Sequence, residues 1–230
     1  MSEVIVAIHQ PNYLPWIGFF HKMLISDIFV FLDHVQFSKR GFINRNKVKG
    51  PDGWKWLTVP VKRGSTKKRI IDVEIDNSTS WAEKHLRTLQ AFYGKCKYFN
   101  YFINLLENIY TKEWKYLADL NKYIIFKVID ILDIDVEIYE SHKMNVKGNK
   151  TDLIIDICKK VGATVYFSGQ GAKKYLDEKK FDVEGIKLVF QNFNHPVYPQ
   201  RFGRFIPNLS IIDMLFNVGP AESKKIIRNI

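Results

Sequence analysis

Side chains able to carry out acid–base chemistry and to bind a polar substrate follow the first apolar segment of the chain. Residues 4–8 (VIVAI) are typical of a fully buried strand, and His9, Gln10 and Asn12 follow it closely. An imidazole at this position can act as a general base or donate a hydrogen bond to a phosphate. The two carboxamides offer donors and acceptors to a substrate. His9 is therefore a candidate catalytic residue, and a structural role for an isolated histidine is the alternative.

Two further polar segments follow predicted strands later in the chain. Residues 168–171 (SGQG) come after an apolar segment, and residues 195–200 (HPVYPQ) come after the predicted strand 186–193. Because ligands of open α/β sheets bind at the carboxyl ends of parallel strands, these segments and His9 are expected to meet at one edge of a sheet. His195 is the second candidate catalytic residue. The backbone amides of the glycine-containing segment can hold a phosphate.

A third group of polar residues follows the predicted strand 28–32. Asp33, His34 and Gln36 lie just beyond it, and His34 is the third candidate catalytic residue. His9, His34 and Asp33 are ligand types for a metal, but the HxH, HExxH and CxxC patterns do not occur, and we expect no metal. The candidate substrate-binding residues are Gln10, Asn12, His21, Asp33, Gln36, Arg40, Asn44, Arg45, Ser168, Gly169, Tyr198 and Gln200.

The positive charge of the chain is concentrated in one segment. The formal net charge is +11, and residues 38–69 contain eleven lysines and arginines against a single aspartate. A local excess of positive charge favours an anionic ligand such as a phosphate or a nucleotide. Arg40 and Arg45 alternate with asparagines and glycines rather than forming a charged tail. This arrangement favours a binding segment over a solvated, lysine-rich surface.

The order of the predicted elements indicates an α/β fold. Strands and helices alternate at both ends of the chain, which predicts a Rossmann-like, mainly parallel sheet of about four or five strands. Residues 54–61 and 70–75 are predicted to form an inserted antiparallel β-hairpin. No linker-like tract divides the chain, so 1–230 are expected to form a single α/β domain in which 36–132 elaborate the sheet. Helices in this inserted segment are predicted over 81–92, 98–110 and 114–132.

The composition excludes several classes of protein. No run of about eighteen apolar residues occurs, so we expect no membrane-spanning helix. A strand is predicted within the first few residues, which leaves no room for a signal peptide. The two cysteines, Cys96 and Cys158, fit a reducing compartment better than a disulfide scaffold. The expected location is therefore the cytoplasm.

Six segments spread over nearly the whole chain carry a family resemblance. They are 9–22 (HQPNYLPWIGFFHK), 42–50 (FINRNKVKG), 53–61 (GWKWLTVPV), 166–169 (YFSG), 195–200 (HPVYPQ) and 209–219 (LSIIDMLFNVG). This set is similar to the signature of the WbqC-like family. Members of that family are bacterial proteins linked to surface-polysaccharide biosynthesis, including the O-antigen of lipopolysaccharide, and are associated with glycine transfer. One departure is Gln170, which stands where the family has a proline.

The resemblance implies a transferase that places an aminoacyl or other acyl group on the amino group of a sugar, with that sugar linked to a nucleotide. In this interpretation the basic segment binds the diphosphate, and His9 or His195 accepts the amine proton. The expected partner is an anionic small molecule, either a nucleotide sugar or an acyl donor. The sequence points to no particular cofactor or oligomeric state.

Two other functions remain open from the sequence. A nucleotidyl- or adenylyl-transferase is one, from a limited resemblance to the HxGH signature, although His9 and His21 lie twelve residues apart. A non-catalytic nucleotide- or nucleic-acid-binding module is the other, because aromatic side chains that can stack on bases are interleaved with the basic residues. These aromatic residues are Phe37, Phe42, Trp54 and Trp56. The chain carries no familiar RNA-binding signature, and we do not expect nucleic acid as a partner.

Overall fold

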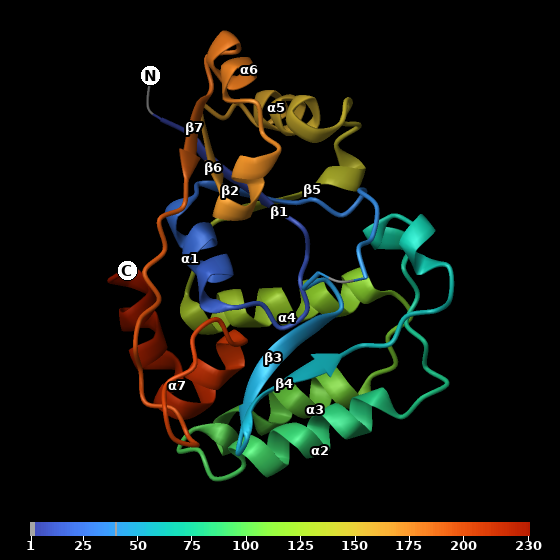
Figure 1. Ribbon diagram of the computed structural model, residues 1–230, viewed down its shortest axis with the longest axis vertical. Coiled ribbons are helices and arrows are strands. Elements are labelled where there is room, and N and C mark those ends of the chain that lie inside the picture. Colours follow the sequence, from blue (N-terminus) through green and yellow to red (C-terminus); the bar gives the residue numbers. More distant parts are fainter. Residues whose placement is uncertain (1–2, 40) are drawn as a thin grey trace.

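A parallel sheet of five strands forms the upper part of the molecule (Figure 1). The structure, a computed structural model, describes residues 3–39 and 41–230. The strands lie in the order β5-β2-β1-β6-β7, and neighbouring strands are parallel. The α/β class and the mainly parallel sheet expected from the sequence are therefore confirmed. The strands are β1 (Ile5–His9), β2 (Ile28–Phe31), β5 (Glu137–Glu140), β6 (Val165–Ser168) and β7 (Lys187–Phe190).

The strand order reverses beside β1. From β1 the chain builds the sheet in one direction through β2 and β5, and it then returns to the other side of β1 for β6 and β7. Such a reversal is a topological switch point, where open α/β sheets bind ligands beyond the carboxyl ends of their strands. At this point β1 ends at His9 and β6 ends at Ser168.

Helices cover both faces of the sheet and enclose two apolar cores (Figure 1). Alternate residues of β1 contact opposite layers, with Ala7 in one core and Val6 and Ile8 in the other. This is the arrangement expected of a parallel strand that is buried on both faces. The core around Ala7 is shared with α1 (Ile17–Ile25), α4 (Leu117–Leu132) and α7 (Ile211–Arg228). The core around Val6 is shared with α5 (Lys150–Lys160) and α6 (Glu178–Val183).

The segment between β2 and β5 adds a hairpin and helices below the sheet (Figure 1). Val48 of the hairpin and Leu89 of the following helix belong to the same apolar core as Ala7 of β1. The inserted segment therefore packs on the sheet through a common core. Its elements before α4 are β3 (Arg45–Gly50), β4 (Gly53–Thr58), α2 (Trp81–Tyr93) and α3 (Ile103–Thr111). Short 3-10 helices of the chain are Ser65–Lys67, Ile70–Asp72, Phe99–Phe102, Ser141–Lys143 and Gln170–Lys174.

The pairing predicted for the hairpin is wrong. β4 pairs with β3, which lies in the basic segment 38–69 and was not predicted as a strand, and not with residues 70–75. The lysines and arginines of β3 obscured its alternation, in which Asn46 and Val48 are buried. Residues 70–72 form a 3-10 helix instead of a strand, and only a single antiparallel bridge between Val61 and Ile75 remains of the predicted pairing among the described residues.

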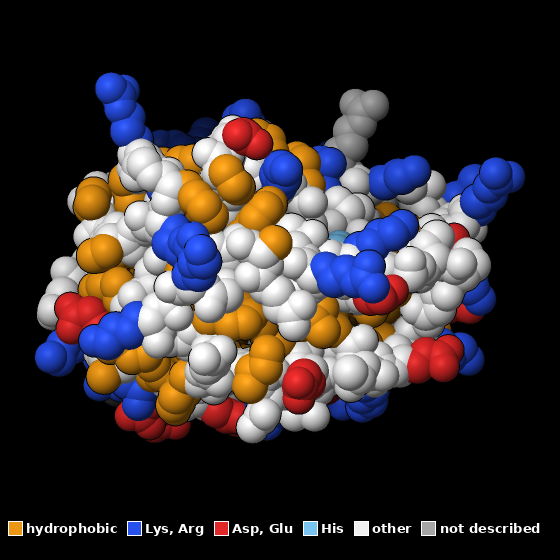
Figure 2. Space-filling model, turned by 90° about the horizontal axis from the view of Figure 1, so that it is seen from below, with side chains coloured by type: hydrophobic (Ala, Val, Ile, Leu, Met, Phe, Trp, Pro, Cys, Tyr) orange, Lys and Arg blue, Asp and Glu red, His pale blue; other side chains and the backbone are white. Residues whose placement is uncertain are grey.

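The face at the lower end of the molecule carries many basic side chains. Figure 2 shows lysine and arginine side chains projecting between apolar ones on this face, in keeping with the net charge of +11. Within residues 3–39 and 41–230, no helix combines the length and the hydrophobicity that crossing a membrane requires.

Candidate functional site

A cavity of about 340 Å³ lies at the topological switch point. Its walls come from the ends of three parallel strands and from α1. His9 ends β1, Gly169 to Gly171 follow β6, and Gln191 follows β7 directly. Lys22 enters from α1. The segments after the three strands therefore converge as expected, although the third contributes residues close to β7 rather than His195.

Lys22 is the most unusual residue of this cavity. Its side chain is buried, with 3% of the residue exposed, and its ammonium forms no hydrogen bond or ion pair with any residue that the structure describes. Burial lowers the pKa of Lys22 to about 8. The Nζ atom lies 3.3 Å from the position that a Cβ atom would occupy on Gly169. A lysine with a buried side chain and no partner for its ammonium, directed at a glycine turn, is destabilising for the fold and is typical of a binding site for an anion.

His9 lies beside Lys22 in a defined tautomer. Its Nδ1 atom is 2.9 Å from the carbonyl oxygen of Gln10, so Nδ1 carries the proton and Nε2 keeps its lone pair. The ring packs edge-on against Phe19, with 5.0 Å between the ring centroids. Burial and the charge of Lys22 lower the pKa of His9 to about 3. His9 is therefore neutral at physiological pH and presents a proton acceptor.

His21 does not line the cavity but contacts Gln191, a residue that does. Gln191 donates from Nε2 to the carbonyl oxygen of Gly18 at 2.9 Å and to Nδ1 of His21 at 3.0 Å. His21 is buried and packs edge-on against Phe193. Its position indicates that it orients Gln191, which lines the cavity.

A second cavity of about 520 Å³ adjoins the first. His9 and Trp16 line both, so the two cavities meet at these side chains. Gln10 and Asn12 line the second cavity, as do Phe42 and Lys47 from the inserted segment. Trp16 lies directly over Gly18, where a Cβ atom would lie 2.4 Å from atoms of the indole ring.

The other two candidate catalytic histidines, His195 and His34, do not line the switch-point cavity. His195 lines a separate hollow beside α7, and its Nδ1 is 2.9 Å from the carbonyl oxygen of Pro196. Its Nε2 is buried without a hydrogen-bond partner among the described residues. Its ring stacks on that of Trp16, with 6.5 Å between the ring centroids. The cavities that His9 lines are therefore different from the hollow that His195 lines.

His34 belongs to an ion cluster at the ends of β2 and β5. Its Nδ1 is 2.6 Å from Oγ of Ser141, which donates in turn to Asp33. Asp33 is fully buried and accepts hydrogen bonds from Lys122 Nζ at 2.6 Å and from His142 Nδ1 at 2.7 Å. Burial opposes ionisation of Asp33, yet Lys122 and His142 hold its pKa below the ordinary value.

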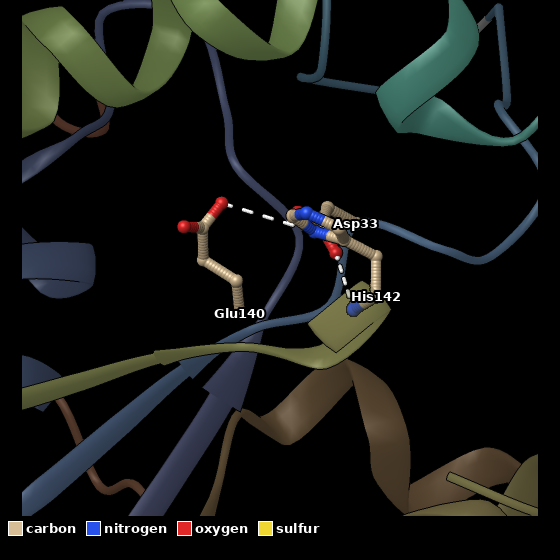
Figure 3. A group of neighbouring side chains, drawn as sticks. All are labelled: Asp33, Glu140 and His142. Carbon is tan, nitrogen blue, oxygen red and sulfur yellow. Dashed lines mark hydrogen bonds and ion pairs between the residues drawn. The ribbon is translucent and has the colours of Figure 1, made fainter. Parts of the chain in front are cut away.

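The same cluster contains a set of metal-ligand types, Asp33, Glu140 and His142 (Figure 3). Lys122 donates to both Asp33 and Glu140, so an ammonium already compensates these carboxylates. A divalent cation would have to displace this lysine. We therefore interpret the cluster as a structural ion network that ties α4 to the ends of two strands.

The remaining predicted binding residues are spread over several places. Asn44 donates to the carbonyl oxygen of Val59 at 2.9 Å, and Gln36 donates to that of Thr66 at 2.6 Å. Ser168 is buried, with Oγ 3.3 Å from the Tyr166 hydroxyl. None of these three residues lines the switch-point cavity. Arg40 lies outside the described residues.

Tyr198 and Gln200 lie in another buried polar group, next to β3 and α7. Gln200 accepts a hydrogen bond from Lys49 Nζ at 3.1 Å and donates to the Tyr198 hydroxyl at 3.2 Å. Asp213 is buried nearby, and its burial raises its pKa to about 7. Neither residue lines the switch-point cavity.

Sequence reasoning missed Lys22, Trp16 and Gln191 as site residues. A signal existed for Lys22, because it follows apolar residues within the helical segment 17–25 (IGFFHKMLI). A lysine at such a position is buried only where the tertiary structure encloses both sides of the helix. Gln191 gave no signal, because it is the first residue after a strand of ordinary composition.

The strand order and the cavity at its switch point are those of Rossmann-like α/β proteins that bind ligands beyond their strand ends. The chain belongs to the WbqC-like protein family, whose model matches residues 10–225. It is 35% identical over 226 residues, covering 97% of both chains, to the uncharacterized protein Rv1507c of Mycobacterium tuberculosis. No solved structure matches the chain.

Proposed function

We propose that this protein is a transferase of bacterial surface-polysaccharide biosynthesis that moves an aminoacyl or other acyl group, such as glycine, onto the amino group of a nucleotide-linked sugar. The buried side chain of Lys22, whose ammonium lines the cavity at the switch point and has no partner among the described residues, is the observation that carries this proposal. It supports an anionic substrate whose phosphates bind at that point. Membership of the WbqC-like family supports the biosynthetic context.

The diphosphate of the substrate binds between Lys22 and the segment after β6. Gly169 and Gly171 lack side chains, so a phosphate can approach the backbone there. The Lys22 ammonium supplies the opposite charge at the end of a buried side chain, where a charge interaction is stronger than at the surface. Bound phosphate oxygens thereby compensate a cation that the protein leaves unpaired.

His9 accepts the proton of the attacking amine. The amine nitrogen attacks the carbonyl carbon of an activated ester or thioester, a carbon–nitrogen bond forms, and the bond to the carrier of the acyl group breaks. The amine proton passes to Nε2 of His9 and then to the departing carrier, so that protons and electrons balance. Burial is the main cause of the lowered pKa of His9, and the charge of Lys22 lowers it further. Phosphate bound at Lys22 offsets this second contribution, which makes the imidazole a stronger base in the loaded site.

The test is calorimetric titration of the protein with UDP-, GDP- and dTDP-linked amino sugars at pH 7. At least one of them is expected to bind, and Lys22→Met is expected to abolish the binding. Lys174→Met is the matched control, because Lys174 is an exposed lysine on the 3-10 helix after β6. Absence of heat with every nucleotide sugar at high protein concentration would exclude the proposal. Release of pyrophosphate from ATP and an acceptor would favour nucleotidyl transfer instead.

A further inference from the structure

One face of the β3–β4 hairpin carries basic side chains stacked on aromatic rings. Nζ of Lys47 lies 4.3 Å from the centroid of the Trp54 ring and 5.3 Å from that of Trp56. Cζ of Arg45 lies 4.3 Å from the Trp56 centroid. With the neighbouring Phe42, whose centroid is 5.9 Å from that of Trp56, these residues form what we call the cation–aromatic face.

The alternation of the two strands separates this face from the core. Lys47 is paired with Trp56 across the hairpin, whereas Val48 and Leu57 point the other way and are buried. Lys49, opposite Trp54, is buried at the edge of this face, where it donates to Gln200. Trp54 and Phe42 are each 45% exposed. Phe37, which the sequence groups with these aromatic residues, is buried instead. Large aromatic side chains left exposed together beside cations are typical of a binding surface.

The cation–aromatic face leads to the reaction centre of the proposed transferase. Phe42 and Lys47 line the second cavity, and His9 lies at the junction of that cavity with the first. A nucleotide sugar with its phosphates at Lys22 and its sugar amine at His9 directs its base away from the hairpin, because the diphosphate separates base from sugar. The face therefore remains available to the second substrate.

We propose that the cation–aromatic face binds the nucleotide end of an acyl donor of the coenzyme A type; this rests on the proposed acyl transfer. An adenine ring stacks on Trp54 or Trp56, and the donor's phosphates contact Lys47 and Arg45. The acyl end then reaches His9 through the second cavity. Three aromatic rings in one row match one or two nucleotides, which favours a small carrier over a strand of RNA.

The test is titration of the full chain with coenzyme A. Binding is monitored by tryptophan fluorescence and, separately, by calorimetry. We expect quenching on binding, and a loss of affinity of roughly tenfold in Trp54→Ala. Phe42→Ala is a second variant at the other end of the face. The matched control is Lys55→Gln, because Lys55 is exposed on the same hairpin and lies over Phe92 on its opposite side. It is expected to bind coenzyme A like the wild type.

Titration of the same variants with the nucleotide sugar separates this proposal from the proposed function. Trp54→Ala is expected to bind nucleotide sugar normally. If coenzyme A binding depends on Trp54 but no nucleotide sugar binds, the coenzyme A site on the cation–aromatic face is supported. The nucleotide-sugar acceptor of the proposed function is then refuted. Failure of the wild type to bind coenzyme A, or equal binding by Trp54→Ala and Phe42→Ala, would overturn the assignment. So would tighter, strongly salt-dependent binding of a single-stranded RNA that coenzyme A does not displace.

Discussion

The Nζ atom of Lys22 lies 3.3 Å from the point where a Cβ atom would stand on Gly169. The lysine comes from the helix after the first strand, and the glycine from the turn after a strand on the other side of the switch point. The two are brought together only by the parallel order of β1 and β6. The short distance places the ammonium of Lys22 where a phosphate can also contact the backbone at Gly169, which has no side chain.

Gly169→Ala is expected to weaken nucleotide-sugar binding without unfolding the protein. The added methyl group displaces the flexible end of Lys22 by a few tenths of an ångström, so the change in stability is expected to stay within about 0.5 kcal/mol. Lys174→Ala is the control, because Lys174 is exposed on the following 3-10 helix and does not line the cavity. Calorimetry on both variants checks this, and equal affinities would contradict the role given to Lys22.

Lys22→Met is expected to stabilise the protein at pH 7. The lowering of the Lys22 pKa from 10.5 to about 8 corresponds to about 3 kcal/mol of destabilisation, as an upper estimate. That penalty is fully present below pH 8. It disappears as the pH rises toward 10.5, because the unfolded chain then also loses the proton. Urea unfolding at pH 7 and at pH 10 measures the gain, which should shrink at the higher pH.

The contrasting variant is Lys122→Met, in the ion cluster. It leaves the buried carboxylate of Asp33 without its lysine partner and is expected to destabilise the protein by about 3 kcal/mol. Changes of opposite sign in the free energy of unfolding would show that the unpaired lysine, Lys22, serves binding and the paired lysine, Lys122, serves stability. A loss of stability in Lys22→Met would show that an interaction compensates its charge.

Binding of a nucleotide sugar is expected to take up protons near pH 8. A phosphate beside Lys22 favours the charged ammonium and raises its pKa, so about half a proton per site is taken up where the free lysine is half protonated. The affinity should therefore fall as the pH rises above 8. Calorimetry in buffers of different ionisation enthalpy measures the uptake, and Lys174→Met should show the same uptake as the wild type.

His9→Asn is expected to lower turnover by roughly 10²- to 10⁴-fold while the fold stays intact. Asparagine retains hydrogen-bonding groups but cannot accept the amine proton. His195→Asn is the comparison, because His195 lines a different hollow and is expected to leave turnover essentially unchanged. Steady-state assays after circular dichroism measure both effects. A large loss of turnover in His195→Asn with little change in His9→Asn would instead assign the reaction centre to the hollow beside α7.

Much of the sheet is predictable from the sequence, whereas the pairing of the hairpin is not. Residues 4–8 and 28–32 are short apolar runs, and only burial on both faces of a parallel sheet accounts for such runs. β3 carries three basic residues in six, so its alternation is visible only once Val48 and Asn46 are seen to be buried. The pairing of β3 with β4 depends on contacts with the core that lie outside the hairpin.

By itself, the sequence determined the class of fold, the polar segments after the strands and the concentration of positive charge. These are local properties, since periodicity and composition are read within a few residues. The tertiary structure alone decided that Lys22 is buried without a partner and that Lys122 is buried with two. It also placed His195 against Trp16, in a hollow that His9 does not line. Burial and pairing depend on residues far apart in the sequence, such as Lys122 and Asp33, which are 89 positions apart. Only the packing of the helices on the sheet brings such residues together.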